Sequence, residues 1–371
     1  MLTAEGCAGR LARVRRMMQA RGWDALVSVQ PGTVNSIERV LVPNGQPVVL
    51  WIEPEAAPLL VTDSSSEPVQ AEREPFESYS PKRPIDLPWP EALVALDRRL
   101  QGRQKPATIA VEKHAAPAGL IELLARRFPR CRLADADVDL RRFRRIKDPD
   151  EVEVLRRLAA IAEAAYARAR AILRPGISEV DVFIELQAAM TSAAGGPVET
   201  PGDYASGPRS LLEGGAPIDR RLEAGDLYVL DLFPAKWGYQ ADLCRTIAVT
   251  PPSAVQREGW NIVVEALSRA EGLVRAGAIA REVYGEIKRF LDGYPLAAGT
   301  FWHHLGHGVG TGGHEAPRLI PESEDTLEAG DVICLEPGLY NPALQGGLRL
   351  ENMYWVGERG VERLNQSTLE L

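Results

Sequence analysis

A short pattern of residues occurs twice in this chain at a constant spacing of 101 positions. The first copy comprises Arg174, Gly176, Val182, Phe183, Glu185 and Leu186, and the second comprises Arg275, Gly277, Val283, Tyr284, Glu286 and Ile287. Each copy joins one helical segment to the next and is followed by two strand-like segments connected by a turn. A unit of two helices and a hairpin that is used twice predicts a pseudo-two-fold domain with both hairpins in one sheet. A single match of this length also arises by chance, which is the alternative interpretation.

The first helix of this unit has a strong start signal. Asp148 is suited to cap the helix, Pro149 to its first position, and Glu151 to closing a capping box. Apolar residues then recur every three or four positions, as on a helix with one buried face: Leu155, Leu158, Ile161, Ala165, Ala169 and Ile172. We therefore expect a domain boundary within 141–147 and a helix that continues to Arg174-Pro175-Gly176.

The residues before this boundary alternate between helix-like and strand-like segments. Helices are predicted near 8–21, 92–100 and 117–128, and strands near 25–29 and 107–112 and on both sides of Glu53-Pro54-Glu55. The stretch 63–90 has no clear period, which predicts a loop with an edge strand. A chain of 371 residues exceeds one usual core. The fold class is therefore α/β (α+β), with a small three-layer domain over 1–140 and a second domain over 141–371.

Charge and composition exclude several classes of function. The formal net charge of −8 argues against a nucleic-acid binder, which needs a dense basic face. No apolar run is long enough to cross a membrane, and the N-terminal segment has the pattern of an amphipathic helix instead of a signal peptide. Four scattered cysteines, Cys7, Cys131, Cys244 and Cys334, favour reduced thiols and a cytoplasmic location, with the last two as small buried side chains.

The first predicted hairpin carries two aspartates in apolar company. On a pleated strand, alternate residues share a face, so Asp231 lies with Leu227 and Val229, and Asp242 lies with Cys244 and Thr246. Burying a carboxylate is costly unless it is paired or bound to a cation. The pattern indicates a metal, although two aspartates near a turn are also common without one.

The second predicted hairpin repeats the pattern with glutamates. Glu336 shares a face with Val332 and Cys334, and Glu351 shares a face with Arg349 on the returning strand. Four carboxylates on two related hairpins need a positive partner. Without one, their repulsion would force some of them to be protonated.

Histidines supply a third signal. Of the five in the chain, His303, His304, His307 and His314 fall within a dozen residues in a glycine-rich segment. This clustering favours a functional role over a structural one. Gly308, Gly310 and Gly313 satisfy a G-x-G-x-x-G pattern, but His314-Glu315-Ala316-Pro317 follows them where a dinucleotide-binding motif would open a helix.

The ordered set Asp231, Asp242, His307, Glu336 and Glu351 resembles the five-ligand site of the pita-bread metallopeptidases, which include Xaa-Pro aminopeptidases, prolidases and methionine aminopeptidases. The resemblance extends over most of 148–356. Its local motifs are Gly225-Asp226-Leu227, Gly238-Tyr239, Arg245-Thr246, Gly306-His307-Gly308, His314-Glu315-Ala316-Pro317, Glu336-Pro337-Gly338 and Arg349-Leu350-Glu351. By layout, residues 1–140 resemble the creatinase-type N-terminal domain of the Xaa-Pro peptidases.

The resemblance implies a dinuclear metal site. Asp231 would hold one ion, His307 and Glu336 the other, and Asp242 and Glu351 would bridge both. Four oxygen ligands and one nitrogen ligand favour Mn²⁺ or Co²⁺, without excluding Zn²⁺ or Fe²⁺.

The resemblance also implies roles in catalysis. The two ions would activate a water, and Glu336 would carry its proton to the leaving nitrogen. His314 would stabilise the tetrahedral intermediate, while His303 and Arg349 would help to hold the substrate.

One departure from the family pattern concerns the substrate. Xaa-Pro peptidases carry a further histidine seventeen positions before the first metal aspartate, where this chain has Gly214, and a shift of one position gives Glu213. The leading hypothesis is a cytoplasmic, homodimeric metallopeptidase for short peptides, of the Xaa-Pro dipeptidase or aminopeptidase type. One alternative is the same chemistry with non-proline or C-terminal-residue specificity. A remote alternative is a non-catalytic binding module, and a metal-free amidinohydrolase is disfavoured because such relatives lose the carboxylate ligands.

Overall fold

The computed structural model describes residues 1–43, 45–212 and 214–371. Glu213, one of the two positions considered for the missing histidine, lies outside the described residues, whereas Gly214 lies within them. The chain divides into two compact units, Met1–Arg144 and Arg145–Leu371. No described helix combines the length and the apolar character that a membrane span requires.

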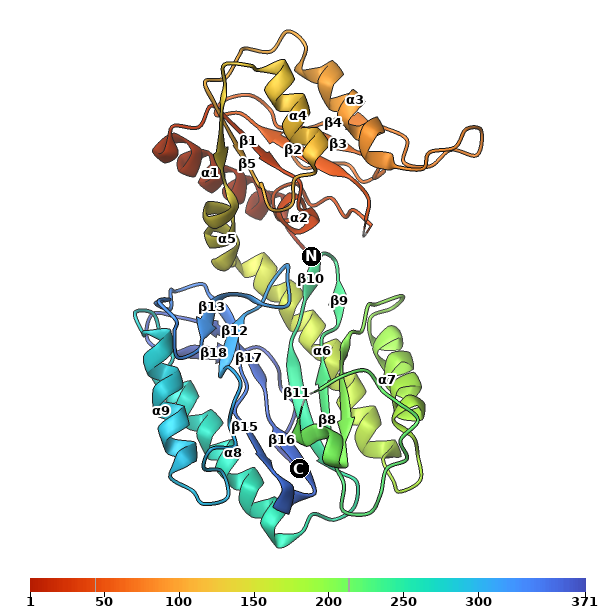
Figure 1. The fold of residues 1–371 in the computed structure, drawn as a ribbon, viewed down its shortest axis with the longest axis vertical. Coiled ribbons are helices and arrows are strands. Elements are labelled where there is room, and N and C mark those ends of the chain that lie inside the picture. Colours follow the sequence, from red (N-terminus) through yellow and green to blue (C-terminus); the bar gives the residue numbers. More distant parts are fainter. Residues whose placement is uncertain (44, 213) are drawn as a thin grey trace. The chain divides into compact units, whose positions relative to one another are not determined.

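The N-terminal unit is a six-stranded mixed sheet between two layers of helices (Figure 1). The strand order is β4-β3-β2-β1-β5-β6. The strands are β1 (Ala25–Ser28), β2 (Val48–Ile52), β3 (Leu59–Thr62), β4 (Glu72–Pro75), β5 (Thr108–Val111) and β6 (Arg132–Asp135). The helices are α1 (Ala4–Arg21), α2 (Pro31–Glu38), α3 (Pro88–Leu100), α4 (Ala118–Arg127) and, at the end of the unit, α5 (Asp137–Arg145).

Successive residues of the strands point to opposite faces of the sheet, so the unit has one hydrophobic core on each face. Leu26 and Leu50 pack with residues of α1 and α2, whereas Val27 and Val49 pack with residues of α3 and α4. This confirms the three-layer arrangement, and β4 confirms an edge strand within 63–90. The sequence did not predict α2, because its segment is rich in residues of low helix propensity such as Thr33. The helix is stabilised instead by the burial of most of its side chains.

The C-terminal unit contains the helix-helix-hairpin unit twice, as predicted. The first copy comprises α6 (Pro149–Ile172), α7 (Glu179–Ala193), β7 (Gly202–Ser206), β8 (Leu227–Leu232), β9 (Ala235–Lys236), β10 (Tyr239–Gln240) and β11 (Leu243–Ala248). The second comprises α8 (Ala254–Leu273), α9 (Ala280–Asp292), β12 (Gly306–Gly308), β13 (Glu315–Leu319), β14 (Val332–Leu335), β15 (Gly338–Asn341), β16 (Gly346–Arg349), β17 (Asn352–Val356) and β18 (Val361–Arg363). The ends of α6 and α8, and the starts of α7 and α9, are each 101 residues apart.

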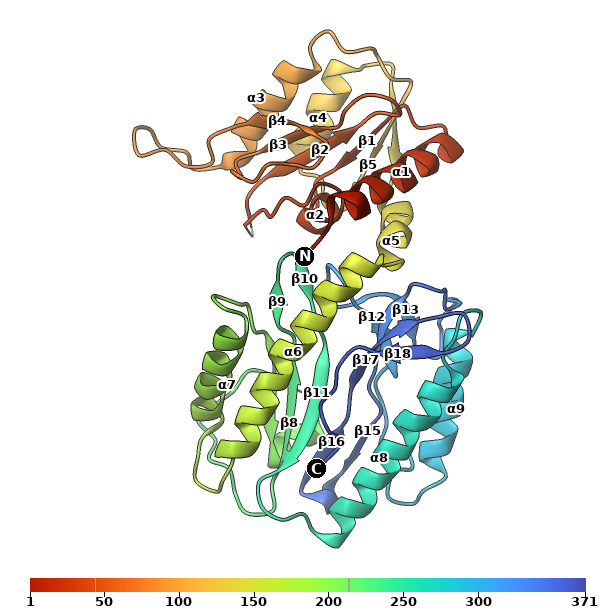
Figure 2. The same ribbon diagram turned by 180° about the vertical axis from the view of Figure 1, so that it is seen from behind.

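The helix boundaries follow from local sequence. The predicted capping box of Asp148 and Glu151 opens α6, and Ser178 forms a second one with Asp181 at the start of α7. The helix α6 packs on β10 and β11, and α8 packs on β14, β15 and β16. In Figure 2, α6 and α8 lie in front of the strands, and Figure 1 shows the strands from the opposite side.

The expectation that both hairpins share one sheet was wrong. The strands form a three-stranded sheet β11-β8-β7, a five-stranded sheet β13-β12-β14-β17-β18, and the two-stranded ribbons β15-β16 and β9-β10. The two halves meet at a bridge between Arg245 and Leu350 instead of along a full ladder. Within the second hairpin, the ladder is interrupted at Glu336 and Glu351 while its register is kept.

Candidate metal centre

The first hairpin places two aspartates at its inner end. Asp231 is paired with Cys244 in β11 and with Asp203 in β7, and Asp242 immediately precedes β11. The ribbon β9-β10 between them turns through Trp237 and Gly238, which both have positive φ, at 56° and 77°. This tight turn returns the chain so that Asp242 comes beside Asp231, and both side chains are buried.

The second hairpin places its two glutamates face to face. Leu335 pairs with Asn352 in one ladder, and Gly338 pairs with Arg349 in the next, so Glu336 and Glu351 oppose each other in the gap. The Glu336 amide donates to the carbonyl oxygen of Leu305 at 2.8 Å. Both glutamate side chains are buried.

His307 reaches the same place from β12. The flanking Gly306 and Gly308 are required because a Cβ at either position would overlap the backbone oxygen of a neighbouring strand. The Nδ1 atom of His307 lies 3.0 Å from the carbonyl oxygen of Gly308. Its Nε2 atom is 3.5 Å from Oδ2 of Asp242 and 3.6 Å from Oε1 of Glu336. Burial lowers the pKa of His307 to about 3, so the ring is neutral and has a lone pair for a cation.

All five predicted ligand residues converge in two overlapping groups. Asp231, Asp242 and Glu351 form one group, in which the potential ligand atoms lie within 4.8 Å of one another. His307, Glu336 and Glu351 belong to the second, together with Cys334. Burial raises the pKa of the Cys334 thiol, so it stays protonated and is a poor ligand. The shared residue, Glu351, joins the two groups.

The electrostatics of this cluster fit divalent cations. Burial raises the pKa of Asp231 to about 7, even though Arg349 opposes this, and burial and neighbouring carboxylates raise the pKa values of Asp242 and Glu351. Oδ1 of Asp231 and both carboxylate oxygens of Glu351 are buried and accept no hydrogen bond from any described residue. Buried acceptors in proteins are normally satisfied. A cation would supply the missing partners and would favour the charged forms.

A chain of hydrogen bonds connects this cluster to the predicted substrate residues. Arg349 donates through Nη1 to Oδ2 of Asp231 at 2.6 Å and through Nε to the hydroxyl oxygen of Tyr340 at 2.8 Å. The Tyr340 hydroxyl in turn lies 2.8 Å from Nε2 of His303, whose Nδ1 lies 2.7 Å from the backbone oxygen of His304. Burial lowers the pKa of His303 to about 4. The neutral tautomer that donates from Nδ1 therefore accepts from the tyrosine at Nε2.

The remaining predicted residue, His314, lies on the open side of the cluster. Its side chain is exposed, and its ring centroid is 4.0 Å from that of His307. The glycine-rich segment that carries both histidines is anchored by Lys147, whose Nζ lies 2.8 Å from Oε2 of Glu315. The other Glu315 oxygen accepts hydrogen bonds from the amides of Thr311 and Gly312 at 3.0 Å.

The sequence did not assign roles to three residues that the structure places here. Tyr340 joins Arg349 to His303, and nothing in its own sequence context signals this. His304 was noted in the histidine cluster without a role, yet its Nδ1 lies 2.9 Å from Oε1 of Glu336. Asp203 lies beside Arg349 because β7 is the neighbour of β8 and Asp203 pairs there with Asp231, which the sequence alone does not reveal.

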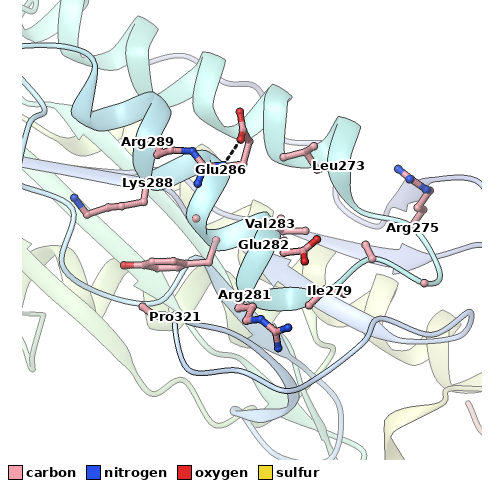
Figure 3. A pocket seen from close by; sticks show the side chains of 14 residues that line it. Leu273, Arg275, Ile279, Arg281, Glu282, Val283, Glu286, Lys288, Arg289 and Pro321 are labelled. Atoms are coloured by element: carbon pink, nitrogen blue, oxygen red, sulfur yellow. Dashed lines mark hydrogen bonds and ion pairs between the residues drawn. The ribbon is translucent and has the colours of Figure 1, made fainter.

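A groove of about 890 Å³ lies along α9. Figure 3 shows its charged rim, where Arg289 is paired with Glu286 and Lys288, Arg281 and Glu282 lie nearby. None of the five converging residues lines this groove. It is therefore separate from the candidate metal centre.

Comparison with known proteins agrees with this geometry. Residues 153–358 match the model of metallopeptidase family M24, a segment that contains all five converging residues. The chain belongs to metallopeptidase family M24. Residues 10–146 match the creatinase/prolidase N-terminal domain.

Relatives of this M24 metallopeptidase include two archaeal proteins named Xaa-Pro dipeptidase. The protein from Pyrococcus horikoshii is 31% identical over 91% of this chain and 95% of its own length. The protein from Pyrococcus furiosus is 36% identical over 62% of this chain, and that match spans 65% of the relative.

Solved structures show the same pita-bread fold. The prolidase from P. horikoshii has a TM-score of 0.82 and is 27% identical in sequence. The superposition covers 98% of this chain and 99% of the prolidase. The Xaa-Pro dipeptidase from Bacillus anthracis has a TM-score of 0.83 at 26% identity, with the same coverage. M24 metallopeptidases use divalent metal ions, so this M24 chain is a peptide-hydrolysing metalloenzyme.

Proposed function

We propose that this M24 metallopeptidase hydrolyses Xaa-Pro dipeptides with two divalent metal ions. The observation that carries the proposal is the convergence of five buried ligand-type residues, with unsatisfied carboxylate oxygens, in a chain similar to Xaa-Pro dipeptidases over most of its length. Residues 141–371 would form the catalytic domain and residues 1–140 the creatinase-like domain.

The ligand assignment of the proposal follows the family resemblance, and the presence of Glu351 in both groups agrees with it. Asp231 would hold one ion, His307 and Glu336 the other, and Asp242 and Glu351 would bridge them, with Mn²⁺ or Co²⁺ favoured over Zn²⁺ or Fe²⁺. When bound, the ions polarise the scissile carbonyl and lower the pKa of a nearby water.

The side chains of this protein would transfer the proton and orient the substrate. Glu336 would accept a proton from the attacking water and pass it to the leaving nitrogen, and the Nδ1 atom of His304 lies 2.9 Å from that carboxylate. His314 would donate a hydrogen bond to the oxygen of the tetrahedral intermediate. His303 and Arg349, linked through Tyr340, would hold the substrate next to Asp231.

Assembly and location belong to the same proposal. We infer a homodimer, and a sedimentation mass equal to the 40.6 kDa of one chain would contradict this. A cytoplasmic location agrees with the four free cysteines. A non-catalytic binding module is not favoured, because such a protein has no need to keep five converging ligand residues.

The test is a peptide-library digest followed by mass spectrometry. The protein is stripped with a chelator, reloaded with Mn²⁺ or Co²⁺, and offered dipeptides and tripeptides with and without proline in the second position. We expect metal-dependent cleavage of Xaa-Pro dipeptides. Equal cleavage of non-proline peptides would favour the alternative specificity, and undiminished turnover by the stripped protein would contradict metal catalysis.

A further inference from the structure

A fifth carboxylate, that of Asp203, lies at the edge of the candidate metal centre. Asp203 in β7 pairs directly with Asp231 in β8, so the two side chains lie on the same face of the sheet. Its Oδ2 atom is 3.7 Å from Nη1 of Arg349, the atom that donates to Asp231 at 2.6 Å. The Asp203 side chain is 27% exposed, whereas that of Asp231 is 4% exposed. Asp203 is therefore the carboxylate of this face that a substrate meets from solvent.

Gly214 lies directly against this carboxylate. The Tyr204 amide donates to the carbonyl oxygen of Gly215 at 2.7 Å, which holds the loop alongside β7. Arg209 fastens the two segments further, with bonds to the backbone oxygens of Tyr204 at 3.0 Å and Ala216 at 3.1 Å. Because of this placement, a Cβ on Gly214 would overlap both carboxylate oxygens of Asp203.

The overlap means that a side chain at Gly214 and the present position of the Asp203 carboxylate exclude each other. The atoms nearest to a Cβ built at Gly214 all belong to the Asp203 carboxyl group, so a side chain there would have to displace that group. Gly214 is also the position at which the family resemblance places a histidine. In this chain, a carboxylate from β7 thus fills the space next to the metal centre that a side chain from the loop would otherwise take.

The charges around Asp203 indicate what it can bind. The distance of 3.7 Å to Arg349 is too long for a hydrogen bond, and Arg349 already donates to Asp231 and Tyr340. The Asp203 carboxylate therefore keeps acceptor capacity on its exposed side. A negative group here repels the C-terminal carboxylate of a short peptide and attracts an ammonium group.

We propose that Asp203 binds an ammonium group of the substrate residue on the N-terminal side of the scissile bond, and that Gly214 leaves room for it. This inference rests on the proposed function. The ammonium is either the α-amine, two bonds from the scissile carbonyl carbon, or the side-chain amine of a lysine. Neighbouring strands are about 4.8 Å apart, so a carboxylate one strand from Asp231 is within reach of both.

The first experiment compares the metal-loaded wild type with Asp203→Asn, which keeps the shape and removes the charge. The probes are Lys-Pro, norleucyl-proline, Ala-Pro and the inhibitor propionyl-proline, which is Ala-Pro without its α-amine. Recognition of a lysine side chain predicts a loss of kcat/KM that is roughly tenfold larger for Lys-Pro than for norleucyl-proline. Recognition of the α-amine predicts a roughly tenfold loss on all three dipeptides and a smaller loss of propionyl-proline inhibition.

Two results would overturn the inference: no loss on any probe, or an equal loss on all four, propionyl-proline included. Wild-type hydrolysis of norleucyl-proline tests the proposed function separately. If the wild type does not hydrolyse it, the proposed function fails, and the same four compounds are compared by calorimetric binding to the two metal-loaded proteins. The loss of binding affinity caused by Asp203→Asn is then compared between the four compounds, and the same patterns support or overturn the role of Asp203.

The second experiment tests this exclusion by thermal unfolding, with the substrate preference as a second readout. Gly214→Ala should displace the Asp203 carboxylate, lower the melting temperature and reduce the Lys-Pro or free-amine preference as Asp203→Asn does. In an Asp203→Gly background the same substitution should not lower the melting temperature, because the overlapping oxygens are gone. Gly272→Ala is the matched control, since nothing lies within 4 Å of its new Cβ. An equal shift from Gly214→Ala in both backgrounds would refute the exclusion.

Discussion

The backbone amide of Glu351 donates a hydrogen bond to the carbonyl oxygen of Cys244 at 3.1 Å. Through this bond, a predicted ligand of the second hairpin is fixed to the strand that follows Asp242 in the first. The two hairpins belong to different sheets, so this contact and the adjacent bridge of Arg245 and Leu350 set the spacing between the two halves of the metal centre. The distances between the ligand residues of the two hairpins therefore depend on these contacts between the two repeats.

Asp242→Asn should abolish tight metal binding. The substitution removes a carboxylate from a buried cluster, so the loss of affinity should exceed the roughly 10- to 100-fold that outer-shell changes cause. The metal-free protein should not lose stability, because asparagine removes a buried charge whose pKa burial has already raised. Metal analysis after dialysis and urea unfolding of the stripped protein check the two parts. Asp219→Asn, at an exposed position, is the control and should retain the wild-type metal content.

Tyr340→Phe should weaken substrate binding while metal content is unchanged. The hydroxyl joins Arg349 to His303, and its loss leaves Nε of Arg349 and Nε2 of His303 without a partner, which costs about 1–3 kcal/mol. We expect a higher KM for Xaa-Pro dipeptides. Tyr228→Phe is the matched control, since the buried Tyr228 hydroxyl has no hydrogen-bond partner among the described residues. A KM equal to that of Tyr228→Phe would contradict the role given to Tyr340.

His304→Ala should lower kcat more than it raises KM. The Nδ1 atom of His304 lies 2.9 Å from Oε1 of Glu336, so without the imidazole the carboxylate can shift, and a misplaced group of this kind can lower the rate by up to roughly 100-fold. Steady-state kinetics together with metal analysis separate this effect from loss of an ion. His114→Ala, in the N-terminal unit, is the control because that ring is half exposed and paired with Asp137. If His304→Ala instead released metal, His304 would have to be counted among the ligands.

Lys147→Met should destabilise the fold by about 3–5 kcal/mol, because it leaves the Glu315 carboxylate without its buried cation. The Lys147 side chain is 1% exposed, and Glu315 holds the amides of the histidine-bearing segment. Urea unfolding measures the change. The exposed pair of Lys288 and Asp292 provides the comparison, since Lys288→Met should cost only about 0.3–0.5 kcal/mol. Similar costs for both variants would show that the buried pair does not hold the segment.

Much of the fold could be predicted from local signals in the sequence. The capping residue Asp148 predicted a helix start that the structure reproduces, and the spacing of 101 residues predicted the repeat. The helix α2 escaped prediction because its segment is stabilised by burial instead of propensity. The single-sheet expectation failed because the two hairpins meet only at the bridge of Arg245 and Leu350, and that contact depends on packing between the repeats.

By itself, the sequence determined which side chains are available for metal chemistry, because carboxylates alternating with apolar residues and clustered histidines are patterns of near neighbours in the chain. The tertiary structure alone decided that Tyr340 links Arg349 to His303 and that the Asp203 carboxylate lies against Gly214. Such contacts join residues on different strands or loops, and their distances depend on strand register and on the junction of two sheets. No periodicity in the chain encodes those quantities, since they result from how the packed elements fill space together.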